Sequence, residues 1–321
     1  MFSPYKDVNI AMQPGTHVLQ SRVTGTLLPL VGADGLIARD LPGLHAITLA
    51  FATGTCSNER WGKLTGPQFA HANIPALDAA GLGYIVSTGG GNGGTFTCAT
   101  PRAFIGFIRR YLAPRLLGID FDIESGQSAA QVHALVADAA VAAKRYPRLR
   151  FTFTLATFAG DDGSHNGLNP LGAMVVKTIQ ASPLRHYVIN LMVMDYDKPG
   201  RHECVVAHGA CAMGASALQA VRNLQHTYSI PASKIALTPM LGNNDTPEQY
   251  FTLADLDTVM HYARSRHLAG VHFWSLDRDT PCSSATLHAA PATAGNAPST
   301  CNTEPGVTPL AYTRRALRDL R

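Results

Sequence analysis

Three acidic residues alternate with apolar residues in the middle of the chain, in the run Asp120-Phe121-Asp122-Ile123-Glu124. Successive side chains of a β-strand point to opposite faces, so Asp120, Asp122 and Glu124 share one face of a predicted strand. Carboxyl groups crowded into a low-dielectric interior cannot all ionise, and at least one keeps its proton near neutral pH. The outermost of them, Glu124, is best placed to pass a proton to a leaving group. The run therefore predicts a general acid of the kind that cleaves glycosidic bonds.

The elements that hold these acids are predicted from short apolar, β-branched runs that alternate with Ala- and Leu-rich helical patterns. Predicted strands cover residues 5–10, 46–52, 83–88, 117–123, 150–155, 187–194, 234–240 and 270–274. The clearest predicted helices cover 101–111, 129–146, 172–181, 215–228 and 253–267, and a closing helix covers 308–320. This alternation predicts an α/β fold, a single (β/α)8 TIM barrel over residues 1–321. A doubly wound open sheet is the alternative, although it suits about six strands better.

Catalytic residues of such barrels lie at the C-terminal ends of the strands, which is where the acidic run ends. Both faces of a barrel strand are buried, so a solvated polar face is a poor explanation of the run. A metal-binding carboxylate cluster is a second alternative. The interval from Met240 to Gly270 holds one loop and one helix. We therefore expect no α+β insertion domain, and a shallow, open cleft that favours internal cuts.

The composition argues against several partners. The chain is 46% hydrophobic and 15% charged, its formal charge is +4, and Lys and Arg are not clustered as in a nucleic-acid-binding protein. No apolar run reaches the ~18 residues that span a bilayer. The glycine-rich run at 89–94 lacks the Lys-Ser/Thr ending of a phosphate-binding loop. We expect a monomer with no cofactor, no nucleic-acid partner and no membrane segment.

Six cysteines form three pairs of neighbours along the sequence: Cys56 and Cys98, Cys204 and Cys211, Cys282 and Cys301. Fifteen pairings are possible, and nearest-neighbour disulfides are one hypothesis among them. Metal binding is less favoured, because there is no C-x-x-C pair and no histidine at ligand spacing. Disulfides predict a secreted protein. The numbering begins without a signal peptide, so a leader was removed or export follows another route. The Ser/Thr/Ala/Pro-rich stretch 283–300 is expected to be a loop closed by Cys282 and Cys301.

The acidic run resembles the D-x-x-D-x-D-x-E motif of glycoside hydrolase family 18, the bacterial chitinase type, and similar segments follow in order at barrel spacing. They are Phe2-Ser3-Pro4-Tyr5-Lys6-Asp7-Val8, Ile47-Thr48-Leu49-Ala50-Phe51, Ser87-Thr88-Gly89-Gly90, Asn190-Leu191-Met192-Val193-Met194-Asp195-Tyr196, Thr238-Pro239-Met240-Leu241-Gly242-Asn243-Asn244-Asp245 and Phe273-Trp274-Ser275-Leu276-Asp277-Arg278-Asp279. One position departs from the motif, since Leu117 stands where the family has its first Asp. We expect this change to alter the buried charge balance more than the reaction.

The resemblance implies a retaining, substrate-assisted mechanism, which differs from the usual scheme with two carboxylates. Glu124 would be the general acid and base, Asp122 would orient the acetamido N–H of the sugar, and Asp120 would share a proton with Asp122. Tyr196 would hold the acetamido oxygen, because strand alternation places it on the inward face with Met192 and Met194. The remaining candidate substrate-binding residues are Asp195, Met194 and Met192, Gly89 and Gly90 after the third strand, Trp274 as an aromatic floor, and Trp61.

Trp61 and Trp274 each have a plain alternative in packing, which is as good an explanation as sugar binding for Trp61. The implied activity is that of an endo-acting chitinase, whose partners are chitin or N-acetylglucosamine oligosaccharides. An endo-β-N-acetylglucosaminidase acting on N-glycans would use the same residues. A lectin-like protein on the same barrel is a third possibility, although such relatives usually lose the terminal Glu that stands here at position 124.

Overall fold

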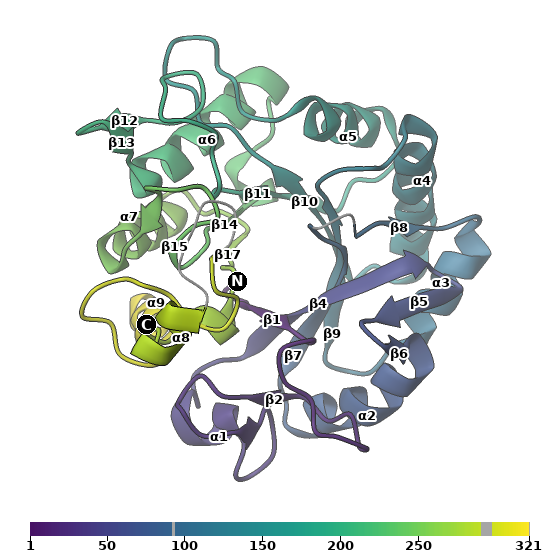
Figure 1. Ribbon diagram of the computed structural model, residues 1–321. Helices are drawn as coiled ribbons and strands as arrows, with labels where there is room; N and C mark the ends of the chain where they lie inside the picture. The colour runs from purple at the N-terminus through teal and green to yellow at the C-terminus, as the bar shows by residue number, and fades with distance from the viewer. Residues whose placement is uncertain (92–93, 290–296, 321) are drawn as a thin grey trace.

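The computed structural model describes residues 1–91, 94–289 and 297–320. Residues 92–93 of the predicted glycine run and 290–296 of the predicted loop lie outside this description. Parallel strands form a ring in the centre, and helices surround it (Figure 1). In chain order, these strands are β1 (Tyr5–Asp7), β4 (Ala46–Thr55), β7 (Gly83–Gly89), β9 (Leu116–Ile123), β10 (Arg150–Ala156), β11 (Tyr187–Met192), β14 (Ile235–Thr238) and β17 (Gly270–Val271).

Hydrogen bonds join the first and last strands of the ring. Strand β1 pairs in parallel with β4, and the neighbours then follow as β7, β9, β10, β11, β14 and β17. On the other side of β1, Tyr5 N–H donates to the carbonyl of Phe273 at 3.0 Å, and Phe2 forms a parallel bridge with Val271. The predicted (β/α)8 TIM barrel is confirmed within the described residues.

Several of the surrounding helices begin at a side-chain cap. The helices are α1 (Leu36–Asp40), α2 (Gly66–Ala79), α3 (Pro101–Arg110), α4 (Ala129–Arg145), α5 (Pro170–Ala181), α6 (Met213–Tyr228), α7 (Leu253–Ser265), α8 (Ser284–Ala289) and α9 (Ala311–Asp319). Ser128 and Gln131 form a capping box before α4, and Asn169 caps α5 through the backbone N–H of Gly172.

Three helices, α1, α2 and α8, lie outside the clearest predicted patterns. Helix α2 contains Pro75 and starts at Gly66-Pro67, which interrupts its helical periodicity. Helix α8 lies in the stretch expected to be a loop, so the prediction of a loop over all of 283–300 is wrong at Ser284–Ala289.

Short strands and turns form the rims of the barrel. They are β2 (Gln20–Ser21), β3 (Leu28–Pro29), β5 (Asn58–Trp61), β6 (Leu64–Thr65), β8 (Phe96–Thr97), β12 (Val206–Ala207), β13 (Ala210–Cys211), β15 (Gly242–Asn243) and β16 (Tyr250–Phe251), with the 3-10 turns η1 (Ala232–Lys234) and η2 (Leu276–Arg278). Between β14 and β17 the chain forms only the β15–β16 hairpin and α7, so no insertion domain occurs there, as expected.

Apolar and polar residues occupy opposite sides of the central strands. On β9, the outward rings of Phe121 and Phe104 of α3 have centroids 5.6 Å apart, and Phe153 of β10 lies 5.0 Å from Phe121. Ile119 and Ile123 are also buried on this side. The helices therefore cover the apolar face of the strand, and the acidic face points into the barrel.

The three predicted disulfides are present: Cys56–Cys98, Cys204–Cys211 and Cys282–Cys301. Each joins cysteines that are neighbours in the sequence, across 42, 7 and 19 residues. None of the helices in the described part of the chain has the length and apolar character needed to cross a membrane.

Candidate active site

A pocket of about 510 Å³ opens at the C-terminal ends of the barrel strands. Its walls come from nearly every strand of the ring, as expected for the reactive end of this fold. The pocket is lined by Tyr5, Asp7, Asn9, Phe51, Thr53, Gly62, Gly89, Gly91, Gly94, Asp122, Glu124, Thr154, Met192, Met194, Asp195, Thr238, Met240, Asp245 and Trp274.

The predicted acidic residues rise along the inner face of β9. Asp120 lies deepest, is 1% exposed and does not line the pocket, whereas Asp122 and Glu124 do. Parallel pairing with β10 sets Thr152 beside Asp120 and Thr154 beside Asp122. The period of the strand therefore places the acids in a column that leads from the barrel interior to the pocket.

Asp120 is held by three hydroxyl groups from three other strands. Its Oδ2 accepts hydrogen bonds from Tyr5 Oη at 2.9 Å and Ser87 Oγ at 2.6 Å. Its Oδ1 accepts from Thr154 Oγ1 at 2.7 Å, and Asn190 Nδ2 donates to that same hydroxyl at 2.9 Å. Burial raises the pKa of Asp120, and these donors oppose the rise because they favour the ionised carboxylate.

Asp122 has no comparable donors. Its Oδ1 is buried and has no hydrogen-bond partner among the described residues, although the side chain lines the pocket. Burial, together with the charges of Glu124 and Asp120, raises the pKa of Asp122 well above the ordinary value. The two carboxyl groups titrate as a pair, and the hydroxyl donors favour the ionised form of Asp120, whereas Asp122 has no such donors.

Glu124 stands at the end of the strand, half-buried against the pocket. Burial, followed by the nearby charges of Asp195 and Asp245, raises the pKa of Glu124 to about 7. A carboxyl group with this pKa is partly protonated near neutral pH and can both give and take a proton. The structure therefore gives Glu124 the property that the acidic run predicts.

Leu117, the departure from the family motif, takes no part in this column. Its side chain packs beside Gly83, where an added Cβ would lie 2.7 Å from Leu117 Cδ1. The inner face of the barrel at this depth instead carries Arg150 of β10, which pairs with Gly118 and whose charge lowers the pKa of Asp120. A cation from the next strand thus contributes to the buried charge balance.

The end of β11 supplies three predicted pocket residues but not the fourth. Met192, Met194 and Asp195 line the pocket, and Asp195 has a left-handed backbone with φ of 49°. Tyr196 is 1% exposed and does not line the pocket, and its Oη is buried with no hydrogen-bond partner among the described residues. Strand β11 ends at Met192, so strand alternation does not reach Tyr196, and its inward orientation stays a prediction.

Trp274 and Phe51 form an aromatic surface in the pocket. Their rings are stacked, with centroids 5.5 Å apart and an angle of 16° between the planes, and both side chains line the cavity. A flat, apolar surface of this kind fits the apolar face of a sugar ring. The peptide bonds Ala50–Phe51 and Trp274–Ser275 are both cis.

Trp61 lies away from the pocket. It is 0% exposed, its ring stacks on Phe69 with centroids 4.1 Å apart, and its Nε1 donates to Tyr111 Oη at 2.8 Å. Trp61 is therefore a core residue, and its assignment to sugar binding is wrong because its side chain packs on Phe69 of α2.

The glycines after β7 leave room for larger groups. Gly89 and Gly91 line the pocket, and a Cβ on Gly91 would lie 3.3 Å from Glu124 Oε2. Gly90 does not line it; a Cβ there would lie 2.7 Å from the ring of Phe51. Gly90 thus contributes indirectly, because its lack of a side chain admits the aromatic ring.

Several pocket residues were missed in the sequence analysis, and the clearest are Tyr5, Phe51 and Asp245. Tyr5 and Phe51 lie in the quoted family-like segments of the first two strands, so alternation along these short strands was the available signal. Asp245 lies in a loop, where no periodicity indicates direction. Among the described residues, no group of three or more His, Cys, Asp or Glu side chains is arranged to hold a metal ion.

Comparison with known proteins connects this site to chitinases. No protein-family model matches the sequence. Endochitinase 11 of Metarhizium anisopliae is 28% identical over 264 residues, which cover 74% of this chain and 48% of that protein. A probable bifunctional chitinase/lysozyme of Escherichia coli (strain K12) is 29% identical over 267 residues, 74% of this chain and 28% of that protein. The chain thus spans about half the length of the first relative and less of the second.

Solved structures show the same fold. The catalytic domain of a hyperthermophilic chitinase from Pyrococcus furiosus superimposes with a TM-score of 0.70 at 22% identity, covering 99% of this chain and 94% of that one. Catalytic-site mutants of active domain 2 of a thermostable Pyrococcus furiosus chitinase, complexed with chito-oligosaccharides, give a TM-score of 0.71 at 21% identity. The predicted resemblance to chitinases is confirmed: the chain is similar in sequence to chitinases and has the fold of a chitinase catalytic domain.

Proposed function

We propose that this protein is an endo-acting chitinase that hydrolyses β-1,4 linkages between N-acetylglucosamine units with retention of configuration. The observation that carries the proposal is the buried column of Asp120, Asp122 and Glu124, which ends in a half-buried carboxyl group in the pocket. Similarity to chitinases supports the substrate class.

Glu124 begins the reaction by donating its proton to the oxygen of the scissile linkage. Burial and two neighbouring acids hold the pKa of Glu124 at about 7, so much of it is protonated at neutral pH. After the leaving group departs, the Glu124 carboxylate takes a proton from the incoming water. One residue thus acts first as acid and then as base.

The substrate itself supplies the nucleophile in this proposal. Its acetamido oxygen attacks the anomeric carbon, the bond to the leaving oxygen breaks, and an oxazolinium ion forms. The free Oδ1 of Asp122 is the acceptor for the acetamido N–H and stabilises the positive charge that develops. Asp120 remains an ionised carboxylate beneath it, held by its three hydroxyl donors. Water then opens the ring from the face that the leaving group vacated.

The apolar walls of the pocket fit the rest of this sugar. Trp274 and Phe51 provide the stacking surface. Met192, Met194 and Met240 also line the pocket, and their flexible thioethers can pack against an acetyl methyl group. Tyr196 does not line the pocket, and Asp195 is the polar side chain at that strand end that does.

The decisive experiment replaces the acid without changing its shape. The Glu124→Gln variant is assayed on a soluble chitin oligosaccharide, and NMR of the wild-type reaction records the anomer formed first. We expect turnover to fall about 10³-fold or more with binding retained, and the first product to be the β-anomer. Near-normal turnover of the variant would refute the role of Glu124, and an α-anomer would refute substrate assistance.

We also propose an extracellular location. Three disulfides are present, and such bonds persist in oxidising compartments. Fractionation of the producing cells, followed by free-thiol labelling of the recovered protein, tests this: abundant reduced cysteines in a cytosolic fraction would contradict it.

A further inference from the structure

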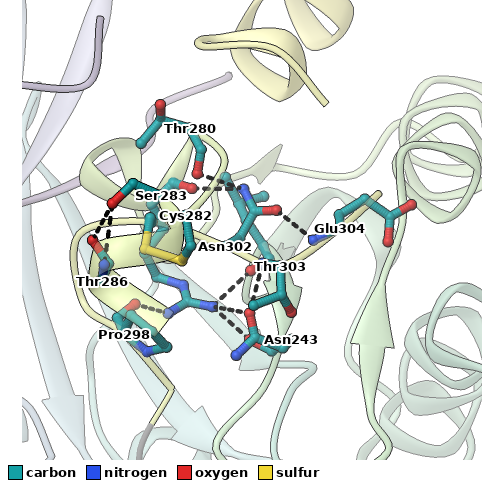
Figure 2. Close-up of a disulfide and its surroundings, with 12 residues drawn as sticks. Asn243, Thr280, Cys282, Ser283, Thr286, Pro298, Asn302, Thr303 and Glu304 are labelled. Atoms are coloured by element: carbon teal, nitrogen blue, oxygen red, sulfur yellow. Dashed lines mark hydrogen bonds between the residues drawn. A yellow bond between two sulfur atoms is a disulfide. The ribbon is translucent and has the colours of Figure 1, made fainter. Parts of the chain in front are cut away.

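The segment that follows the C-terminal disulfide is tied to the end of the last barrel strand. Cys282 and Cys301 are bonded, and the next residue, Asn302, reaches back (Figure 2). Its Nδ2 donates to the carbonyl of Arg278 at 2.7 Å, and its backbone N–H donates to the carbonyl of Thr280 at 2.9 Å. The disulfide and Asn302 together fasten this segment to the η2 turn.

Arg278, at the end of η2, carries a fully buried guanidinium. Its Nη2 donates to the carbonyls of Leu241 at 2.9 Å and Asn243 at 2.5 Å, and its Nη1 donates to the carbonyl of Pro298. Among the described residues it forms no ion pair within 4.0 Å, although burial of an unpaired cation is costly. This one side chain joins the loop after β14 to the disulfide-closed segment.

The pocket residue Asp245 lies in the loop after β14 and is held from two sides, by Ala297 and by Asp195. The backbone N–H of Ala297, next to Pro298, donates to Asp245 Oδ1 at 2.8 Å. On the other side, Asp195 Oδ1 accepts the backbone N–H of Asp245 at 2.7 Å. Asp245 lines the pocket with Glu124, and its charge is one of those that raise the pKa of Glu124.

We infer that Arg278 is a positioning residue, which fixes the loop after β14 against residues 297–298 and so holds the carboxylate of Asp245 at the pocket wall beside Glu124. The inference rests on the proposed function, in which Glu124 is the acid. A guanidinium is suited to this task because its planar fork reaches several carbonyl groups at once, which a lysine ammonium on a flexible stem does not.

The charges around Glu124 fix the sign of the effect. Asp122 on β9, Asp195 after β11, Asp245 after β14 and Asp7 on β1 all line its pocket, and the Arg278 cation lies behind the loop of Asp245. Removing or displacing the negative charge of Asp245 lowers the pKa of Glu124. The acid then loses its proton at lower pH, so the alkaline limb of kcat/KM moves to lower pH.

The test is a double-mutant cycle on a soluble chitin oligosaccharide, with kcat/KM measured across pH for Arg278→Lys, Asp245→Asn and the double variant. Arg278→Lys keeps the charge and loses the fork. We expect each single variant to move the alkaline limb down by roughly half a pH unit. The double variant should move it no further than Asp245→Asn alone. The inference would be overturned if the shifts of the alkaline limb in the two single variants added up in the double variant. It would also be overturned if a folded Arg278→Lys protein had the same alkaline limb as the wild type.

Two further variants keep the test sharp. Arg314→Lys is the matched control, because Arg314 is a half-exposed arginine of α9 that lies 3.6 Å from Asp40, and its profile should equal that of the wild type. A shifted limb in this control would overturn the inference. If Arg278→Lys does not fold, the Cys282→Ser/Cys301→Ser variant frees the segment without touching Arg278. An unchanged limb there counts against the inference, and a limb shifted to lower pH supports it.

Failure of the inference and failure of the proposed function differ in outcome. If Glu124→Gln is active, the proposed function falls. If Glu124→Gln is inactive but the alkaline limb of kcat/KM is the same in Arg278→Lys as in the wild type, only the positioning role of Arg278 is refuted.

Discussion

The active-site acids are held in two different ways. Asp120, Asp122 and Glu124 lie on one strand whose neighbours are fixed by parallel pairing. Asp195 and Asp245 lie in loops and are held by hydrogen bonds to segments 49 to 52 residues away in sequence. The strand acids are positioned by the barrel itself, and the loop acids are positioned by each other and by Arg278. We therefore expect the strand acids to govern whether the reaction occurs, and the loop acids to govern at which pH it is fastest.

The largest effect should come from Asp122→Asn, after the loss of Glu124 itself. The variant keeps the shape but loses the charge that stabilises the oxazolinium ion, and its amide can present an N–H where an acceptor is needed. We expect kcat to fall about 10²-fold or more. The measurement is steady-state kinetics on a chitin oligosaccharide. A fall of less than about threefold would show that the two groups of acids are not distinct in this way.

A smaller effect is expected at the base of the strand column. Tyr5→Phe removes one hydroxyl donor from Asp120, so the pKa of Asp120 rises further. The ionised form that the reaction needs is then lost at higher pH, and the acid limb of the profile should move up, with kcat reduced about tenfold. The control is Tyr312→Phe, whose hydroxyl donates to the carbonyl of Phe251 outside the pocket. Equal profiles for the two variants would contradict the role given to Tyr5.

The loop side is tested by Asp195→Asn. The substitution keeps the oxygen that accepts the backbone N–H groups of Asp245 and Thr246, and removes the charge. Because that charge raises the pKa of Glu124, the alkaline limb of kcat/KM should move to lower pH. We expect the limb to shift by roughly half a pH unit to one unit. A limb that moves to higher pH would show that the sign of this coupling is wrong.

The smallest effect on activity is expected from Trp61→Phe. The change removes the indole N–H that Tyr111 Oη accepts in the core, and Trp61 does not line the pocket. The free energy of unfolding should fall by about 1–3 kcal/mol, while kcat/KM is unchanged. Denaturant unfolding and kinetics on the same preparation check both parts. A loss of activity without a loss of stability would indicate that Trp61 contributes to substrate binding.

The sequence by itself determined the barrel and the acid column, and it offered the observed disulfide pairing as one hypothesis among fifteen. These follow from local rules, because strand alternation has a period of two and each disulfide joins neighbouring cysteines. The departure at Leu117 was also visible, although the place of Arg150 near Asp120 depends on the pairing of β9 with β10.

Only the tertiary structure decided which loop side chains reach the pocket. The prediction for Tyr196 extended the strand period beyond Met192, where β11 ends, and the structure shows that Tyr196 does not line the pocket. From the sequence, core packing and sugar binding were equally good explanations of Trp61. Its contacts with Phe69 and Tyr111 show that it belongs to the core. Asp245 owes its place to Asp195 and Ala297, which lie 50 and 52 residues away. Contacts over such distances depend on the closed barrel and have no period in the sequence.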